Sequence, residues 1–435
     1  MKKYITIISS LVVSLGAMAQ ETIYPAPAYN GLLFIKNGTV HTGNGQVLTN
    51  TTIQINNGKI EKIGTNLAIP TDDVKVVDAT GKHVYPGLIL SNTNTGIKEI
   101  GSGVRGSNDF NEIGELNPNV RSIIAYNTDS KIINTLRSNG ILFANIAPQG
   151  PLLAGSSSVV QFDAWSYEEA TYNADGAMHF YMPSLFTRPR GGAARPAAQP
   201  EVDPLKAAME KIEDVKSFLR EAKAYQSEKN RTATNLKFES VKGLFDKSQR
   251  FFVHCNLVKE MLVAIDFVKE FGFDVTIVGG SESFQIASLL KQNNIAVILQ
   301  QLHSLPTSED DDVDQPFKTP AVLQQAGVLF ALTDEDGQTT GRNLMFNAGT
   351  AASYGLTKEE ALQSITLNAA KILGIANRTG SIEVGKDANI IISEGDILDM
   401  KSSVVTRAFI QGRDINLDDK HKQMNERYKK KYNIK

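Results

Sequence analysis

Two asparagines just after an apolar segment are the first residues whose types and spacing suggest a site for chemistry. Asn92 and Asn94 follow the segment "PGLIL" in the sequence and are separated by one residue. Residues i and i+2 of a strand point to the same face, so such a pair can hold one ion or one ligand. Histidine suits a divalent ion at this spacing. An asparagine amide is a weak neutral oxygen donor, so the segment has the spacing of a metal site without its strongest donors.

Apolar, strand-like runs that alternate with helical segments provide the elements to position this pair. Their alternation indicates a (β/α)₈ barrel, and a doubly wound open sheet is the competing architecture. The strand-like runs are 87–90, 141–148, 158–162, 177–183, 251–255, 275–280, 295–300 and 327–336. The helical segments are 204–228, 258–271, 282–292 and 358–373. Because catalytic residues of such barrels come from the strand ends, residues that follow the runs are the candidate site residues.

Both ends of the chain are rich in β-type patterns and differ from the middle. Near the N-terminus, Asn-Gly pairs that tolerate the positive φ angles of hairpin turns begin at Asn37, Asn44 and Asn57. Alternating apolar and polar residues return near the C-terminus. We therefore expect a β-sandwich composed of residues 20–85 and 380–417, a barrel over 86–379, and a basic surface helix over 418–435.

The N-terminus has the pattern of a secretory signal. "MKK" precedes an apolar run that ends near the small residues Ala17 and Ala19, so we expect removal of residues 1–19. A membrane anchor is the alternative, but the run is shorter than the roughly 20 residues of a spanning helix. We expect an exported protein, periplasmic or secreted, with no membrane span after cleavage. Cys255 is the only cysteine, so an internal disulfide is excluded.

The charge balance narrows the class of partner. The formal net charge is −2, and loss of Lys2 and Lys3 with the signal makes the mature chain more acidic. This balance indicates neither a nucleic acid nor an anionic membrane as the partner. We expect a small-molecule substrate or ligand instead.

Two segments resemble the signatures of a known family. "VYPGLILSNTNTG" resembles the Pro-Gly-Leu-Ile-Asp-x-His-x-His motif that opens the barrel of the amidohydrolase superfamily. "EEALQSITLNAAKILGIANRTGSIEVGKDANIIISEGD" is similar, nearly position by position, to the closing signature of the same superfamily. The imidazolonepropionase-related branch fits best. The resemblance spans about residues 30–415 and implies a barrel with a composite β-sandwich.

The resemblance also implies a reaction and a set of ligands. Members of the superfamily are mostly hydrolases of amide, cyclic amide and related C–N bonds, in which a divalent ion, most often zinc, activates water and a carboxylate takes the proton. The first ligand pair of the family falls on Asn92 and Asn94. The strand-5 histidine falls on His254, the strand-6 histidine near Gly279 and the strand-8 aspartate on Asp334. Only His254 and Asp334 keep their type, whereas catalytic zinc usually keeps three protein ligands.

Each candidate residue has a functional role and a structural alternative. We expect Asp334 to act as base or metal ligand and His254 as metal ligand, unless they are a helix-capping aspartate and an interior histidine. Asn92, Asn94 and His303 are expected to contact the substrate. The alternatives are amides that bond to loop backbone and, for the histidine in "QLHSLP", an ordinary surface position. A reduced metal site would need a further ligand, from His179, Asp336 or the substrate.

Three functions follow from these positions. The first is an amidohydrolase with a reduced single-metal site. The second is a non-catalytic homologue that binds a small molecule or pairs with an active amidohydrolase as a homo- or hetero-oligomer, and the loss of three ligand positions favours it on physical grounds. The third is metal-free catalysis by Asp334, which ranks last because amide hydrolysis without an ion or an activated nucleophile loses much electrostatic stabilisation.

Overall fold

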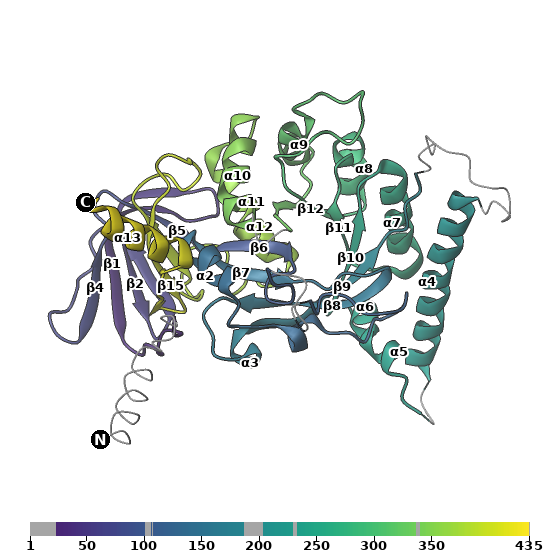
Figure 1. Cartoon of the computed structure of the whole chain (residues 1–435), viewed down its shortest axis with the longest axis horizontal. Helices are drawn as coiled ribbons and strands as arrows, with labels where there is room; N and C mark the ends of the chain where they lie inside the picture. The colour runs from purple at the N-terminus through teal and green to yellow at the C-terminus, as the bar shows by residue number, and fades with distance from the viewer. Residues whose placement is uncertain are drawn as a thin grey trace, which may run out of the picture.

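The described part of the chain forms two eight-stranded sheets with helices around one of them (Figure 1). The computed structural model describes residues 23–100, 106, 108–186, 203–228, 233–335 and 340–434. The expected signal peptide, residues 1–19, lies outside these residues. One sheet is built by strands from both chain ends and the other by strands from the middle.

The elements follow one another in the order of their labels in Figure 1. The strands are β1 (Leu32–His41), β2 (Val47–Asn56), β3 (Lys59–Gly64), β4 (Val74–Asp78), β5 (His83–Pro86), β6 (Leu88–Thr93), β7 (Ile141–Ile146), β8 (Leu152–Gln161), β9 (Thr171–Tyr181), β10 (Arg250–Cys255), β11 (Val275–Gly279), β12 (Ala296–Leu299), β13 (Phe330–Leu332), β14 (Ile390–Ser393), β15 (Val405–Ile410) and β16 (Arg413–Asp414). The α-helices are α2 (Lys131–Ser138), α3 (Tyr167–Ala170), α4 (Pro204–Ser227), α5 (Leu236–Ser240), α6 (Lys242–Asp246), α7 (Val258–Phe271), α8 (Ala287–Gln292), α9 (Gln315–Gln325), α10 (Leu344–Ser353), α11 (Lys358–Ser364), α12 (Leu367–Ile372) and α13 (Lys420–Tyr432). The 3₁₀ helices are η1 (Ser122–Ala125), η2 (Ser283–Ile286) and η3 (Gly341–Asn343).

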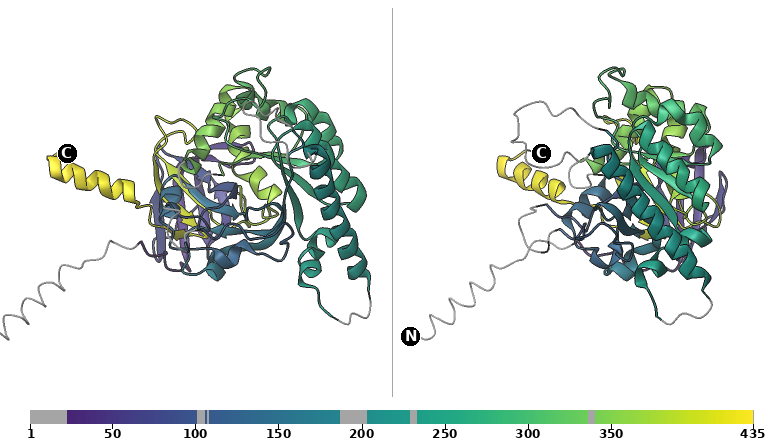
Figure 2. Two further views of the ribbon diagram at one scale, coloured as in Figure 1. Left: turned by 45° about the vertical axis from the view of Figure 1, so that its right-hand side comes forward. Right: turned by 90° about the vertical axis from the view of Figure 1, so that its right-hand side faces the viewer.

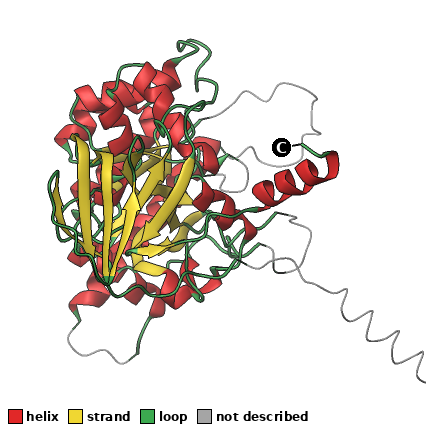
Figure 3. Ribbon diagram, turned by 90° about the vertical axis from the view of Figure 1, so that its left-hand side faces the viewer, coloured by secondary structure: helices red, strands yellow, loops and turns green. Residues whose placement is uncertain are grey.

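The first sheet joins the two ends of the chain (Figure 3). Its order is β16-β15-β14-β5-β1-β2-β3, and β4 pairs with β1. The N-terminal and C-terminal parts meet where β5 and β14 run antiparallel, with Pro86 opposite Ile390. A separate apolar core lies on this sheet, and it includes the fully buried Ile53 and Phe409. The composite β domain predicted from both chain ends is thus present.

The three Asn-Gly pairs of this region serve two different purposes. Asn57 and Gly58 form the tight turn between β2 and β3, and Asn44 lies in the connection between β1 and β2. The hairpin predicted at Asn37 is wrong, because this residue lies inside β1. Its φ of 63° accompanies a register shift against β2, which is a bulge. Asn-Gly supplies positive φ, and a bulge requires this conformation as much as a turn does.

The second sheet is a nearly closed barrel, as the sequence predicts, although one strand is reversed. Its order is β13-β12-β11-β10-β9-β8-β7-β6, and strands β9 to β13 are all parallel. Strand β8 runs antiparallel to both neighbours. The connection over residues 147–151 is short and contains two prolines. A parallel crossover needs a dozen or more residues, so this connection can only form a turn.

One side chain bridges the gap between the first and last strands of the barrel. Thr333 Oγ1 accepts a hydrogen bond from the backbone N–H of Asn92 at 3.1 Å and donates to the Asn92 carbonyl at 3.0 Å. The Ile89 N–H donates to the Ile365 carbonyl at 2.9 Å. The strand that carries the asparagine pair is therefore fixed to the last strand without a continuous ladder between them.

The register of the barrel strands fixes which side chains share its inner row. Tyr181 of β9 lies opposite His254 of β10, and His254 lies opposite Val278. Val278 pairs with Ile298, and Ile298 pairs with Ala331. Paired residues of neighbouring strands point to the same face. The row therefore changes from polar side chains on β9 and β10 to apolar ones on β11 to β13.

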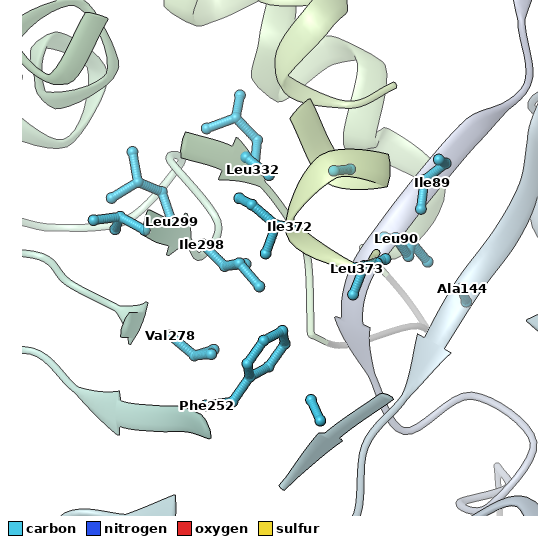
Figure 4. Close-up of a cluster of buried hydrophobic side chains, with 14 of the residues drawn as sticks. Ile89, Leu90, Ala144, Phe252, Val278, Ile298, Leu299, Leu332, Ile372 and Leu373 are labelled. Carbon is cyan, nitrogen blue, oxygen red and sulfur yellow. The ribbon is translucent and has the colours of Figure 1, made fainter. Parts of the chain in front are cut away.

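The apolar part of this row belongs to an apolar cluster that fills the barrel (Figure 4). Phe252, Val278 and Ile298 come from three successive strands, and Ile372 of α12 lies beside them. All four side chains are buried. Water is excluded from this part of the barrel, so polar chemistry is confined to the strand ends.

Helices α4 and α7 cover the outside of the barrel on one side (Figure 1). Asp203 caps α4 by accepting from the Leu205 N–H, and Pro204 occupies its first turn. The buried stripe of this helix consists of Ala208, Ile212, Val215, Leu219 and Ala222. The i, i+4, i+7 spacing of these residues is that of one helix face, which packs on the barrel.

The C-terminal helix α13 projects from the body of the molecule (Figure 2). Asp419 caps it by accepting from the N–H groups of His421 and Lys422. None of its residues is buried. Among the described helices, including this one, none is both long and apolar enough to cross a membrane.

Candidate functional site

The strand ends β9 to β12 and the residues after β13 surround a cavity of about 1320 Å³. Tyr181, His254, Gln300 and Glu335 are among the side chains that line it. Such barrels carry their sites at this end. We call this space the mouth cavity.

Two histidines are bonded to each other, and one of them, His254, lines the mouth cavity. His179 Nδ1 lies 2.8 Å from His254 Nε2, so one ring donates its proton to the other. Burial lowers the pKa of His179 to about 3. Burial, and secondarily the neighbouring His179, holds the pKa of His254 far below its usual range. Both imidazoles are therefore neutral at physiological pH.

Tyr181 forms an aromatic wall against His254. The two rings stack with centroids 3.9 Å apart and planes at 14°. The Tyr181 hydroxyl donates to the Pro148 carbonyl at 2.9 Å, which fixes the ring. Burial, and then the charge of Glu335, raises the pKa of Tyr181 well above its usual value, so the hydroxyl stays protonated.

Glu335 is the carboxylate that reaches the mouth cavity from the last barrel strand. Its Oε1 accepts from Gln149 Nε2 at 2.8 Å, and its Oε2 accepts from Gln300 Nε2 at 2.9 Å. Thr93 Oγ1 donates to its backbone carbonyl at 3.3 Å. Segments that follow three strands, β7, β12 and β13, thus hold one half-buried carboxylate in place.

The asparagine pair is buried next to this carboxylate's strand but does not line the mouth cavity. Asn92 is 0% exposed and Asn94 is 5% exposed. Neither amide atom of Asn92, nor Oδ1 of Asn94, has a hydrogen-bond partner among the described residues. The backbone of Asn92, by contrast, is bonded to Thr333. The side chains expected to contact substrate are therefore enclosed by protein.

Asp334 and His303, the other expected site residues, also lie away from the mouth cavity. Asp334 is buried, and its Oδ1 accepts from Thr340 Oγ1 at 2.7 Å. His303 is exposed, and its Nε2 lies 2.8 Å from Thr350 Oγ1 on α10. It lines a different cavity beside α10. Asp336 lies outside the described residues.

Asn256 occupies the space next to Gly279, where the resemblance places the strand-6 histidine. Gly279 has φ +105°, and a Cβ at this position would lie 2.6 Å from Asn256 Oδ1. Asn256 Oδ1 in turn accepts from Ser281 Oγ at 2.9 Å. A larger side chain at Gly279 would have to displace this bonded pair.

Four residues of the site were not predicted from the sequence: Tyr181, Gln300 and Glu335, which line the mouth cavity, and Gln149, which bonds to Glu335. Two of them had a local signal. Tyr181 is two places after His179 on one strand, and Glu335 is two places after Thr333, so each shares a face with a residue of the barrel interior. The two glutamines lie in irregular segments and had none.

Comparison with known proteins identifies the family. The fold, a barrel with a composite β domain, is that of a solved amidohydrolase. This amidohydrolase structure, from Thermotoga maritima MSB8, superposes with a TM-score of 0.76 at 26% identity, over 88% of this chain and 99% of that one. The model of the amidohydrolase family matches residues 238–415. Residues 238–415 thus match the amidohydrolase family, and the predicted family and fold class are both confirmed.

Two curated relatives match over parts of their length. Amidohydrolase tasK of Hapsidospora irregularis is 19% identical over 386 residues, which cover 81% of this chain and 38% of tasK. An imidazolonepropionase of Thermoplasma volcanium is 35% identical over 86 residues, which cover 19% of this chain and 21% of that enzyme. The chain thus matches well under half the length of each.

Members of the superfamily are typically metal-dependent, yet the donors found here do not fit such a centre. The described residues contain no group of three or more His, Cys, Asp or Glu side chains that could hold an ion. Two imidazole nitrogens on one tetrahedral zinc lie about 3.3 Å apart, given Zn–N bonds of roughly 2.0–2.1 Å. The 2.8 Å contact between His179 and His254 is a hydrogen bond between rings instead.

Proposed function

We propose that this protein is a non-catalytic member of the amidohydrolase superfamily that binds a small molecule in the mouth cavity. One observation carries the proposal: the ligand positions hold two amides, a glycine and a histidine whose ring is bonded to His179. Asn92 and Asn94 offer no imidazole nitrogen and no charge, which a zinc-like ion prefers. The mouth cavity is present, and its polar groups are held in fixed positions.

The carboxylates also argue against hydrolysis. Asp334, at the position of the family's aspartate, is bonded to Thr340 and does not line the mouth cavity. Glu335 does line it, but the described residues offer no set of ligands for an ion that would polarise an amide carbonyl and activate water. A lone carboxylate forfeits most of the electrostatic stabilisation that amide hydrolysis needs.

A hydrolase with a reduced single-metal site is the second candidate. It is favoured by the retained residue types at His254 and Asp334. It requires these two residues to be joined by a third ligand, from His179, Asp336 or the substrate.

The deciding experiment measures hydrolysis and binding on the same preparation. Protein without a polyhistidine tag is assayed against amides and cyclic amides, with and without added Zn²⁺ or Mn²⁺, and screened for ligands by thermal shift. We expect no metal-dependent turnover and at least one ligand that raises the melting temperature, with loss of this shift in Tyr181→Ala. Turnover that requires metal and disappears in His254→Ala, but persists in the matched surface variant His303→Ala, would establish the hydrolase.

We also propose that the protein functions after export, periplasmic or secreted. The proposal rests on the signal-like pattern of residues 1–19. N-terminal sequencing of protein from the native cell should begin at Gln20. An intact Met1 on the abundant form would contradict it.

A further inference from the structure

We infer that the ligand of the mouth cavity is an organic cation, a protonated amine that binds Glu335 beside the Tyr181 ring. The inference rests on the proposed function, since it names the chemistry of the molecule which that function requires. Three independent features of the cavity support it: the pairing of its carboxylate, its charge balance and its aromatic wall.

Glu335 is positioned but not neutralised. Both of its carboxylate oxygens accept from neutral amides, Gln149 and Gln300, and no cationic side chain pairs with it among the described residues. A carboxylate oxygen has two lone-pair directions, so each oxygen can accept one more hydrogen bond. A half-buried carboxylate without a counter-ion is costly, and a bound ammonium group would supply both the charge and the donors.

The remaining charges of the cavity favour the same sign of ligand. The other carboxylates of the lining are Glu260, Glu282, Glu309 and Asp310. Among the described residues of the lining, the cation is Lys259, whose ammonium group donates to the Leu185 carbonyl. An anionic ligand would meet several like charges here, whereas a cation is attracted from a distance.

Two of those carboxylates are bonded to backbone groups, and the other two, Glu309 and Asp310, are exposed, which leaves Glu335 as the half-buried contact. Glu260 accepts from the N–H groups of Asn256 and Leu257 at 3.2 Å, at the start of α7. Glu282 accepts from the Val258 N–H at 2.8 Å. These two carboxylates order the first turn of α7. Their negative charge still attracts a ligand, but because they bind backbone N–H groups they are not free to orient toward it.

The aromatic wall completes a cation site. Tyr181 is held by Pro148 through its hydroxyl, so its ring keeps one orientation in the cavity that Glu335 also lines. A cation near the face or edge of a fixed tyrosine gains cation–π attraction. The His254 ring stacks on the other side of the tyrosine and fixes the plane of the wall.

A matched series of three ligands tests the inference. Benzylamine, benzyl alcohol and benzoate share a ring and differ in charge, and each is titrated into the full chain by calorimetry at low and high salt. We expect measurable binding of benzylamine, weakened by salt, and at least about tenfold weaker binding of the alcohol and benzoate. Glu335→Gln should weaken the amine at least about tenfold, whereas Glu221→Gln, an exposed carboxylate on α4 that does not line the cavity, should change it less than about twofold.

The outcomes distinguish a failure of this inference from a failure of the proposed function. Binding of the alcohol or benzoate as tight as that of the amine, lost in Tyr181→Ala, would overturn the cation while leaving a binding protein. Failure of the amine to bind at all would also overturn it. A Glu335→Gln variant with an unchanged melting temperature excludes unfolding as the reason for lost affinity. Metal-dependent turnover would instead remove the proposed function.

Discussion

The buried ion cluster between the two sheets and the buried amides of β6 use polar side chains in opposite ways. In the cluster, Asp163 Oδ1 accepts from Arg137 at 2.6 Å, and its Oδ2 accepts from Arg413 at 3.0 Å and from the Ala26 N–H at 2.9 Å. At β6, the side-chain amide of Asn92 is equally buried and makes no hydrogen bond to a described residue. The carboxylate that joins the sheets is thus paired at both oxygens, whereas the amide of Asn92, where the resemblance places a metal ligand, is not.

The contrast between these two regions indicates which polar groups stabilise the fold. An unpaired buried amide costs free energy, about 1–3 kcal/mol, and persists only where function or ancestry keeps it. A paired buried charge is strongly destabilising only when its partner is removed. The two regions should therefore respond to substitution in opposite directions.

The largest effect is expected in the ion cluster. Asp163→Ala leaves Arg137, which is 3% exposed, without its counter-ion. We expect the free energy of unfolding in urea to fall by about 3–5 kcal/mol. As a control, removal of the exposed ion pair in Glu213→Gln should leave the midpoint unchanged. A loss below about 1 kcal/mol for Asp163→Ala would mean that the cluster does not hold the sheets together.

The paired and unpaired asparagines give the sharpest contrast. Asn389 is buried like Asn92, but its Nδ2 donates to Thr379 Oγ1 and its Oδ1 accepts from the Gln411 N–H. Asn389→Leu should destabilise the protein by about 2–3 kcal/mol because it leaves the Gln411 N–H unsatisfied. Asn92→Leu should be neutral or stabilising by about 1 kcal/mol. Equal losses in urea denaturation would show that the Asn92 amide has a partner in solution.

The histidine pair predicts a dependence of stability on pH. The pKa of His179 is about 3 in the folded protein and about 6.5 in the unfolded chain, so below pH 6.5 the unfolded state binds protons first. Stability should therefore fall with acidification, by about 2 kcal/mol from this residue between pH 7 and 4.5. His179→Asn should reduce this slope to the part contributed by His254, and the exposed His421→Asn should keep it. An unchanged slope in His179→Asn would contradict the burial of a neutral ring.

Restoring a side chain at the strand-6 position is expected to cost stability. Gly279→Ala would place a Cβ 2.6 Å from Asn256 Oδ1 at a φ of +105°, so we expect a loss of about 1–3 kcal/mol. Gly272→Ala, at φ +72° with no atom within 4 Å, is the matched control and should lose only about 1 kcal/mol. A Gly279 variant no worse than the control would show that the space is open to a ligand residue.

The sequence predicted the fold well because its signals were local. Apolar runs marked the barrel strands, and the closing signature marked the family. The direction of β8 was not predictable from periodicity, since a strand has the same pattern in either direction. It depended on the length of the segment 147–151, which excludes a crossover helix.

The site was less predictable because it depends on contacts across the barrel. His179 and His254 are far apart in sequence, and only the register of β9 against β10 brings them to 2.8 Å. The motif pointed to Asp334, whereas the neighbouring Glu335 lines the mouth cavity. A one-residue difference after a strand changes which side chain faces the site, and a motif alone does not resolve it.

The metal content of the native protein tests most directly whether the retained ligand positions hold a divalent ion. Chain purified from its own host without chelators is analysed by inductively coupled plasma mass spectrometry, together with His254→Ala. We predict less than one equivalent of zinc, manganese or iron per protein chain, and the same metal content in the native protein and in His254→Ala. One equivalent of metal in the native protein, lost in His254→Ala, would contradict the account.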